Sequence, residues 1–225
     1  MIKVDEIEVC GFPHAIRGMR NPMNSWDRSD SIKITAEECK VCIDYDGDPE
    51  CKECAGIHIG THDLALMQKL YKAGTEHRKY LRQIFASMDV IAPLYWWKEF
   101  DTYKVGTAAN SCSTMHKITA KAFEESDFSF DGIADLEAIS ASIGQVTVLN
   151  KLREKYLETK DKATWCEIIK LLPESYNQRR TITMDYENAF SMIKQREGHK
   201  LQEWQDFVEV LKGLPYVREI GGLEY

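Results

Sequence analysis

Two C-x-x-C pairs, Cys39 with Cys42 and Cys51 with Cys54, are the feature that most constrains how this chain folds. The eight residues between the pairs are rich in Asp, Gly and Pro, which favour a tight turn. Two thiolates at this spacing bind one tetrahedral ion, and a hairpin brings the second pair back to complete the shell. The pattern predicts an inserted zinc-knuckle hairpin over residues 37–56, with zinc in a structural role because a closed four-thiolate site has no open position.

Two alternatives to zinc remain open for these four cysteines. The same ligands suit an iron–sulfur cluster, and reduced surface cysteines need no metal. The total of seven cysteines is odd, which argues against a disulfide framework. We interpret Cys10, Cys112 and Cys166 as small buried hydrophobic side chains, with a nucleophilic Cys112 as the less favoured alternative.

Length and charge restrict the class of protein. A chain of 225 residues is long enough for one fold with an insert, so we expect a single domain over 1–225. The net charge of −7 argues against binding to a nucleic-acid polymer. No apolar run reaches the roughly 18 residues of a membrane span, and the N-terminus lacks the pattern of a signal peptide. We therefore expect a cytoplasmic protein without membrane contact.

Hydrophobic periodicity predicts a strand at the N-terminus and several helices. The alternating stretch 2–9 indicates the strand, and Pro93 fits the first turn of a short helix. Further helices are expected at 62–73, 145–160, 161–172, 183–196 and 201–211. Gly74 and Pro173 stand where helix ends are expected.

Landmark residues follow one another in a definite order through the second part of the chain. His77 stands fifteen residues before an Ala-Pro pair that opens a helix. In chain order the landmarks are His77, Ala92-Pro93, Thr102-Tyr103-Lys104, Asn110, Ser113, Leu171-Leu172-Pro173, Tyr176, Thr183-Met184-Asp185, Gln195-Arg196 and Gln202-Glu203-Trp204. Over roughly 62–211 this order resembles the flavin-dependent thymidylate synthase family.

The resemblance implies a fold and a reaction. The fold is α+β, a mixed sheet with long helices, assembled as a homotetramer with sites at subunit interfaces. The reaction is that of an FAD-dependent methyltransferase, in which dUMP is methylated with methylenetetrahydrofolate as carbon donor and a nicotinamide cofactor as reductant. Expected partners are therefore a pyrimidine deoxynucleotide, folate and the nicotinamide cofactor.

The resemblance also assigns roles to individual residues. Arg196 matches the arginine at the uracil ring, and Ser113 matches the serine near the nucleotide phosphate; we name these two as catalytic. Nucleotide-binding candidates are Lys98, Asn110, Ser113 and Arg196. Flavin-binding candidates are His77, Tyr103, Lys104, Asp185 and His199.

The chain departs from the family at several of these positions. Thr102, Tyr103 and Lys104 stand in place of the Arg-His-Arg motif that grips phosphates, and Met115 replaces an arginine. Asp185 and Glu187 stand where the family has Asn and Arg on the flavin. Two alternatives therefore stay open: a divergent relative that binds or modifies another nucleotide without flavin, and a non-catalytic binding protein whose zinc clip presents a partner surface.

Overall fold

The computed structural model describes residues 2–34 and 56–223, which form two compact units. The first unit holds the residues up to Lys3 together with 90–102 and 109–181. The second unit holds 4–89, 103–108 and 182–225. The predicted zinc ligands lie outside the described residues.

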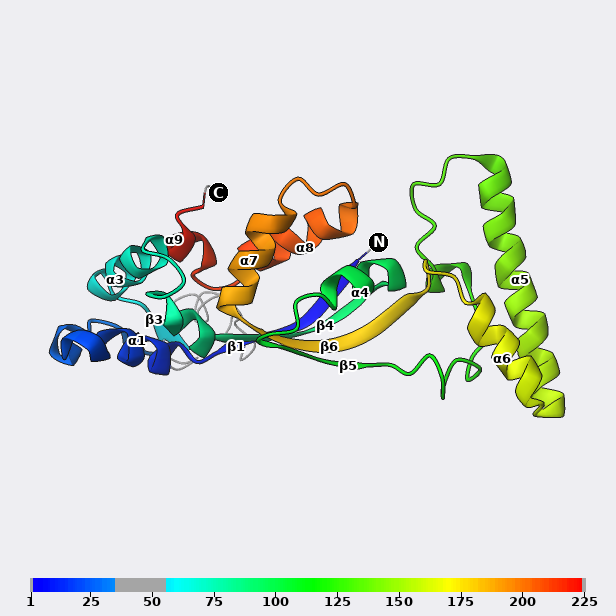
Figure 1. Ribbon diagram of the computed structural model, residues 1–225, viewed down its shortest axis with the longest axis horizontal. Helices are drawn as coiled ribbons and strands as arrows, with labels where there is room; N and C mark the ends of the chain where they lie inside the picture. Colours follow the sequence, from blue (N-terminus) through cyan, green and yellow to red (C-terminus); the bar gives the residue numbers. More distant parts are fainter. Residues whose placement is uncertain (1, 35–55, 224–225) are drawn as a thin grey trace, which may run out of the picture. The chain divides into compact units, whose positions relative to one another are not determined.

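A four-stranded sheet runs through the chain in the order β1-β4-β6-β5 (Figure 1). Its strands are β1 (Lys3–Cys10), β4 (Phe85–Pro93), β5 (Thr107–Ser111) and β6 (Asn177–Asp185). Leu94 N donates to Tyr176 O at one end of the β4–β6 pair, whereas Ser87 and Thr183 meet at the other. Residue numbers thus rise in opposite directions along these neighbours. The predicted mixed sheet is corrected here to an antiparallel one, whereas the α+β class with long helices is confirmed.

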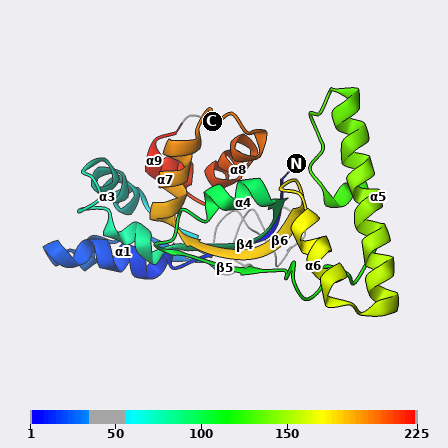
Figure 2. The same ribbon diagram turned by 45° about the vertical axis from the view of Figure 1, so that its right-hand side comes forward.

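The first unit contains α4 (Leu94–Phe100), the short 3-10 helix η4 (Glu125–Asp127), α5 (Leu136–Thr159) and α6 (Lys162–Leu171). Helices α5 and α6 lie side by side in both ribbon views (Figures 1 and 2). A cluster that includes Phe123, Leu149 and Ile168 is buried between these helices and the preceding loop. Helix α5 starts well before the predicted Gln145, because Asp135 caps it by accepting a hydrogen bond from Ala138 N.

The second unit contains most of the helices. They are α1 (Phe12–Arg20), η1 (Asn21–Met23), η2 (Trp26–Arg28), α3 (Thr61–Lys72), η3 (Lys79–Gln83), α7 (Tyr186–Arg196), α8 (Gln202–Lys212) and α9 (Val217–Gly221). A two-stranded sheet joins β2 (Ile32–Lys33) to β3 (Ile57–His58) in antiparallel register. Large side chains fill the core: Phe12, Tyr186, Trp204 and Phe207 are fully buried.

Several predicted elements are confirmed and others are wrong. The N-terminal strand and the helices at 62–73, 161–172 and 201–211 match β1, α3, α6 and α8 to within about two residues. The helix predicted at 183–196 starts only at Tyr186, because β6 continues to Asp185, which caps α7. The burial predicted for the three single cysteines is also wrong. Cys10 and Cys112 are exposed and Cys166 is partly exposed.

Within the described ranges, no helix is both long and apolar enough to span a bilayer.

Candidate functional site

Arg196 ends α7 and is held between two aromatic rings of the second unit. Its guanidinium carbon lies 4.5 Å from the ring centre of Trp204 on α8 and 5.6 Å from that of Tyr103. Its Nε donates a 2.9 Å hydrogen bond to the hydroxyl of Tyr103. Cation–π contacts and this hydrogen bond together fix the plane of the guanidinium. We call Tyr103, Gln195, Arg196, His199 and Trp204 the Arg196 centre.

Hydrogen bonds extend outward from the guanidinium. The Tyr103 hydroxyl accepts from Arg196 and donates to Gln195 Oε1 at 3.0 Å. His199 Nε2 lies 3.2 Å from Arg196 Nη1, and His199 Nδ1 accepts from Leu201 N at 3.2 Å. A neutral imidazole has one accepting nitrogen and one N–H, so a ring whose Nδ1 accepts from Leu201 N carries its hydrogen on Nε2 and contacts Arg196 without accepting from it.

Asp185 stands at the start of α7 and is buried. Its Oδ1 accepts from the backbone and side-chain nitrogens of Asn188, both at 2.8 Å. Burial raises the pKa of Asp185 above 3.8, against the hydrogen bonds from Asn188, and nearby Glu187 raises it further. Gly106, with a φ of 78°, passes so close that a Cβ there would collide with the Asp185 carboxylate.

Glu187 forms an ion pair with Arg78. Arg78 Nη2 and Nε lie 2.8 and 3.0 Å from Glu187 Oε1, and the Arg78 guanidinium covers the ring of Tyr71 at 5.3 Å. In the described part of the chain, the other oxygen of Glu187 is buried without a hydrogen-bond partner. The two acidic residues that replace Asn and Arg of the resembling family therefore take part in internal contacts.

The predicted phosphate-binding residues Lys98, Asn110 and Ser113 belong to the first unit. Lys98 Nζ pairs with Glu174 at 2.7 Å. Ser113 Oγ accepts from two backbone nitrogens, those of Met115 at 3.2 Å and His116 at 2.9 Å. Asn110 is exposed on β5. Each of these contacts is local to the first unit.

Arg180, a further cation of the first unit, is also paired with a carboxylate. Its Nη1 contacts Asp101 Oδ1 at 2.8 Å, and its guanidinium lies 4.2 Å from the ring centre of Trp97. In the second unit, Lys104 is exposed. Arg180 thus completes an ion pair, whereas Lys104 faces solvent next to Tyr103 of the Arg196 centre.

His77 is exposed and lines a cavity of about 500 Å³ between α1, α3 and η3. Tyr80 and Gln83 line the same cavity. None of the described residues that line it belongs to the Arg196 centre. Of the predicted site residues, the structure therefore brings together Tyr103, Arg196 and His199, and places His77 elsewhere in the second unit.

Sequence reasoning missed two members of the Arg196 centre. The sequence analysis used Trp204 and Gln195 only as landmarks. Trp204 is fully buried, and its ring faces the guanidinium. The available signal was position: Arg196 ends one helix, and Trp204 lies in the first turn of the next.

Over residues 2–34 and 56–223, no group of three or more His, Cys, Asp or Glu side chains is arranged to hold a metal ion. The four predicted zinc ligands are not among the described residues, so their metal binding stays a prediction.

Comparison with known proteins gives a fold and no sequence family. No family model and no curated protein matches the sequence. Two crystal structures of the flavin-dependent thymidylate synthase ThyX from Helicobacter pylori, each with FAD and dUMP, are similar in fold. One gives a TM-score of 0.64 over 96% of this chain and 97% of that chain; the other gives 0.65 over 99% and 97%. Sequence identity is 16% to both. The chain therefore has the fold of the flavin-dependent thymidylate synthases.

Proposed function

We propose that this protein binds a pyrimidine deoxynucleotide of the dUMP type, with the pyrimidine ring at the Arg196 centre. The observation that carries this proposal is the guanidinium of Arg196, oriented by Trp204, Tyr103 and His199. A guanidinium with a fixed plane donates well to the carbonyl oxygens of a uracil ring. The ring of Tyr103 offers a flat surface beside it for stacking. Two ThyX structures of the same fold, solved with FAD and dUMP, support the choice of nucleotide.

The chemistry that Arg196 offers is electrostatic. When a nucleophile such as hydride adds to the C5=C6 bond of the pyrimidine ring, negative charge builds on a ring carbonyl oxygen as an enolate, and a donor already aimed at that oxygen lowers the barrier. This role suits the first candidate reaction, thymidylate synthase-like methylation of dUMP. In this candidate reaction, methylenetetrahydrofolate and a nicotinamide cofactor are the co-substrates, and the protein acts as a homotetramer. The residues proposed to lie near the nucleotide phosphate are Ser113, Lys98, Asn110 and Lys104.

The residues for FAD fit that group poorly. Asp185 and Glu187 take the positions where the resemblance expects neutral and positive side chains toward the flavin. Both are carboxylates in internal contacts, and the second oxygen of Glu187 is buried and unpaired among the described residues. A diphosphate placed beside them would meet like charge in a partly desolvated site. This observation favours the second candidate, a relative that binds or modifies a pyrimidine nucleotide without flavin.

Calorimetric titration of the full chain with dUMP tests the nucleotide proposal. We expect Arg196→Ala to weaken dUMP binding about tenfold or more, because hydrogen bonds to a charged group are among the stronger ones. Lys194→Ala, an exposed cation on the same helix, is the matched control and should bind as the wild type does. Equal affinities in wild type and Arg196→Ala would overturn the proposal.

An absorbance spectrum with and without added FAD separates the two candidate reactions. Flavin bands in the purified protein, sharpened by dUMP, together with rescue of a thymidine auxotroph, would support the synthase. A protein that binds dUMP and ignores FAD would support the relative without flavin. In the latter case, Asp185→Asn is the variant with which to look for recovered flavin binding, since it removes one of the two charges and keeps the helix cap.

The zinc-knuckle hairpin over residues 37–56 is a separate proposal that rests on the sequence alone. Cys39, Cys42, Cys51 and Cys54 would hold one structural zinc ion in a closed shell. Metal analysis of the purified protein should find about one zinc per chain, and Cys39→Ser should reduce that content. A metal-free wild type, or iron in place of zinc, would contradict the assignment.

A further inference from the structure

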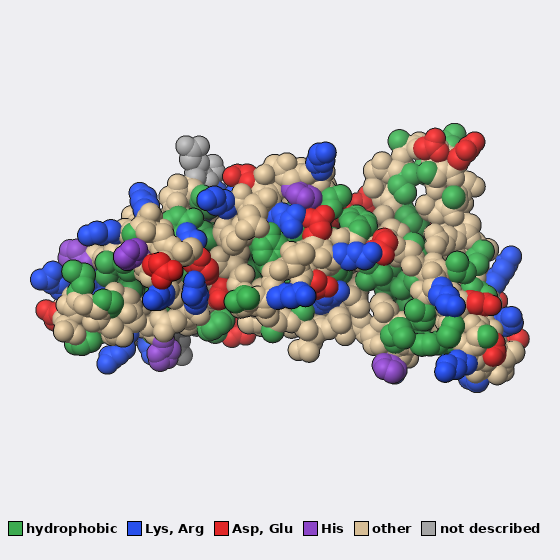
Figure 3. Space-filling view, in the orientation of Figure 1, with side chains coloured by type: hydrophobic (Ala, Val, Ile, Leu, Met, Phe, Trp, Pro, Cys, Tyr) green, Lys and Arg blue, Asp and Glu red, His purple; other side chains and the backbone are tan. Residues whose placement is uncertain are grey.

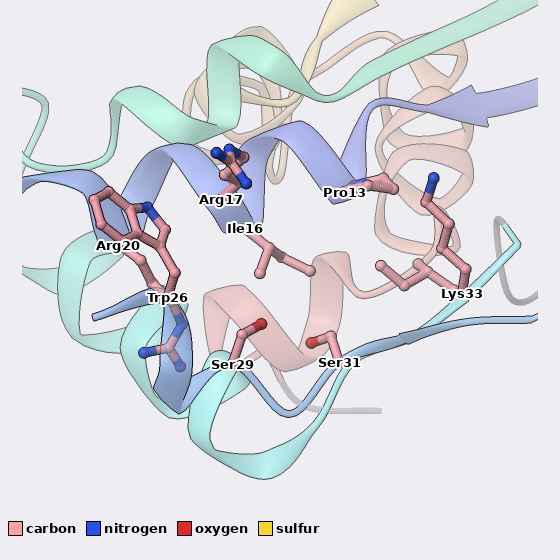
Figure 4. A pocket seen from close by; sticks show the side chains of 9 residues that line it. Pro13, Ile16, Arg17, Arg20, Trp26, Ser29, Ser31 and Lys33 are labelled. Atoms are coloured by element: carbon pink, nitrogen blue, oxygen red, sulfur yellow. The ribbon is translucent and has the colours of Figure 1, made fainter. Parts of the chain in front are cut away.

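A second cavity of the second unit, of about 220 Å³, lies between α1, η2 and the β2–β3 pair (Figure 4). The described charged side chains that line it are all positive. Among the described residues that line it, Arg17, Arg20 and Lys33 are cations and none is a carboxylate. Such a lining is notable in a chain with a net charge of −7. Figure 3 shows Lys and Arg side chains on the part of this unit that carries α1 and α3, with Asp, Glu and His side chains among them.

Arg20 and Asp63 make the cavity rigid. Arg20 is buried and donates from Nε to Asp63 Oδ1 at 2.6 Å, while its Nη1 contacts Ser25 O at 3.2 Å. The hydroxyls of Ser29 and Ser31, which also line the cavity, donate to the other oxygen of Asp63. One buried carboxylate thus fixes three lining side chains, and their geometry exists before any ligand arrives.

Arg17 and Lys33 are the cations available to a ligand. Both are exposed, and within the described part of the chain neither takes part in a salt bridge. They come from different elements, Arg17 from α1 and Lys33 from β2; in Figure 4 Arg17 is drawn above Ser29 and Ser31, and Lys33 lies beyond Ser31 at the right of the view. Two cations from separate elements match the several oxygens of one phosphate better than a single charge does.

An aromatic and apolar wall completes the cavity. The indole of Trp26 is 45% exposed, and its Nε1 donates to Asn21 Oδ1 at 2.8 Å, which fixes the ring. Ile16 and Ile57, which are both buried, line the same cavity. A flat ring that enters the cavity would lie against these groups. The volume is below the range of about 300–1,000 Å³ typical for drug-sized ligands, so it fits one ring and little more.

We propose that this cavity binds a small phosphate ester that carries one planar ring, with the phosphate at Arg17 and Lys33 and the ring against Trp26. The site shares no residue with the Arg196 centre. The proposal is independent of the function proposed above. A pyrimidine nucleotide and a simpler phosphorylated aromatic compound offer the same chemistry, and the experiment distinguishes them.

The test is calorimetric titration of the full-length protein with phenyl phosphate, compared with inorganic phosphate, benzoate and UMP. Phenyl phosphate should bind about tenfold more tightly than inorganic phosphate, because stacking on an aromatic side chain adds to the charge contact. Because UMP could also bind at the Arg196 centre, the comparison with UMP uses Arg196→Ala: tighter binding of UMP than of phenyl phosphate in that variant identifies a nucleotide as the natural class, and the reverse order identifies the simpler ester. Equal binding of phenyl phosphate and inorganic phosphate would overturn the role of the ring. Benzoate binding as tightly as phenyl phosphate would overturn the choice of phosphate.

Variants locate the binding. Arg17→Glu, Lys33→Glu and Trp26→Ala each change an exposed side chain, so folding is preserved, and each should weaken phenyl phosphate binding about tenfold or more. Lys72→Glu is the matched control, since Lys72 is an exposed cation in the last turn of α3, as Arg17 is in the last turn of α1. Unchanged binding in Arg17→Glu and Lys33→Glu, or binding lost in Arg196→Ala, would overturn the assignment to this cavity.

Discussion

Arg78 and Glu187, which are 109 positions apart in the chain, form an ion pair with 2.8 Å between Nη2 and Oε1. The exposed fractions of the two side chains are only 20% and 16%. The pair joins the segment before η3 to the first turn of α7, the helix that ends in Arg196. It therefore supports the helix that carries the proposed nucleotide-binding arginine.

Replacing Arg78 by Ala should lower the free energy of unfolding by roughly 2–4 kcal/mol, because it leaves Glu187 charged and largely buried without its partner. Lys98→Ala breaks a pair with Glu174 whose side chains are 68% and 54% exposed, and should cost at most about 1 kcal/mol. Urea denaturation of both variants measures the difference. Similar losses in the two variants would contradict the role of burial.

Asp185→Asn should raise stability at neutral pH. The pKa of Asp185 is raised above 3.8 by burial, so its ionisation opposes folding at neutral pH, and this cost disappears as pH falls below the folded-state pKa. Asparagine keeps the cap on α7 without the charge. The melting temperature of the variant should exceed that of wild type at neutral pH, and the difference should shrink as the buffer approaches pH 3.8. A lower melting temperature at neutral pH would argue against the buried charge as a cost.

Asp63 should show the opposite pH dependence. Burial acts to raise its pKa, but hydrogen bonds from Ser31, Ser29 and Arg20 outweigh burial and lower the pKa below 3.8. Its stabilising contribution is therefore present above pH 3.8 and is lost as pH falls through the lower folded-state value. Asp63→Asn should cost about 3–5 kcal/mol at neutral pH, since it leaves Arg20 buried without its counter-charge. Acid titration of both proteins, followed by circular dichroism, should show their stabilities converging at low pH.

Tyr103→Phe should weaken dUMP binding about three- to tenfold while leaving the ring in place, because only the hydrogen bonds that orient Arg196 and Gln195 are lost. Tyr156 packs against the buried cluster of the first unit, and Tyr156→Phe is the control that should leave dUMP affinity unchanged. Calorimetry on the two variants measures the effect. An effect of equal size in both would remove Tyr103 from the nucleotide site.

Local signals made part of the fold predictable. Asp161 and Gly74 mark helix boundaries through caps, so α6 and the end of α3 follow from the sequence. The start of α7 was misplaced because Ile182 and Met184 suit either a strand or a helix, and the sequence alone does not reveal that β6 has neighbours on both sides. The early start of α5 was missed although Asp135 supplies a cap there.

The resemblance alone named Tyr103, Arg196 and His199 as members of the candidate site. Local sequence patterns did not connect them, because Tyr103 lies 93 positions from Arg196. The ion pair of Lys98, a predicted nucleotide-binding residue, joins it to Glu174, 76 positions away, and nothing near Lys98 in the sequence reveals this partner. Long-range pairing is decided by the tertiary fold, which single-sequence patterns do not contain.

The β2–β3 pair makes one point of the chain suitable for insertions. Ile32 and Lys33 pair with His58 and Ile57, and Ile34 N donates to Gly56 O at 3.1 Å, so residues 34 and 56 are held next to each other. Two hydrogen bonds tie the β2–β3 pair to the start of α3: His62 N donates to Asp30, and Ser31 N donates to Asp63. Because the cost of closing a loop rises only slowly with its length, whatever lies between the two points can be lengthened, shortened or exchanged with little effect on the fold. Evolution or an engineer can therefore graft a new module between residues 34 and 56 while the rest of the fold stays as it is.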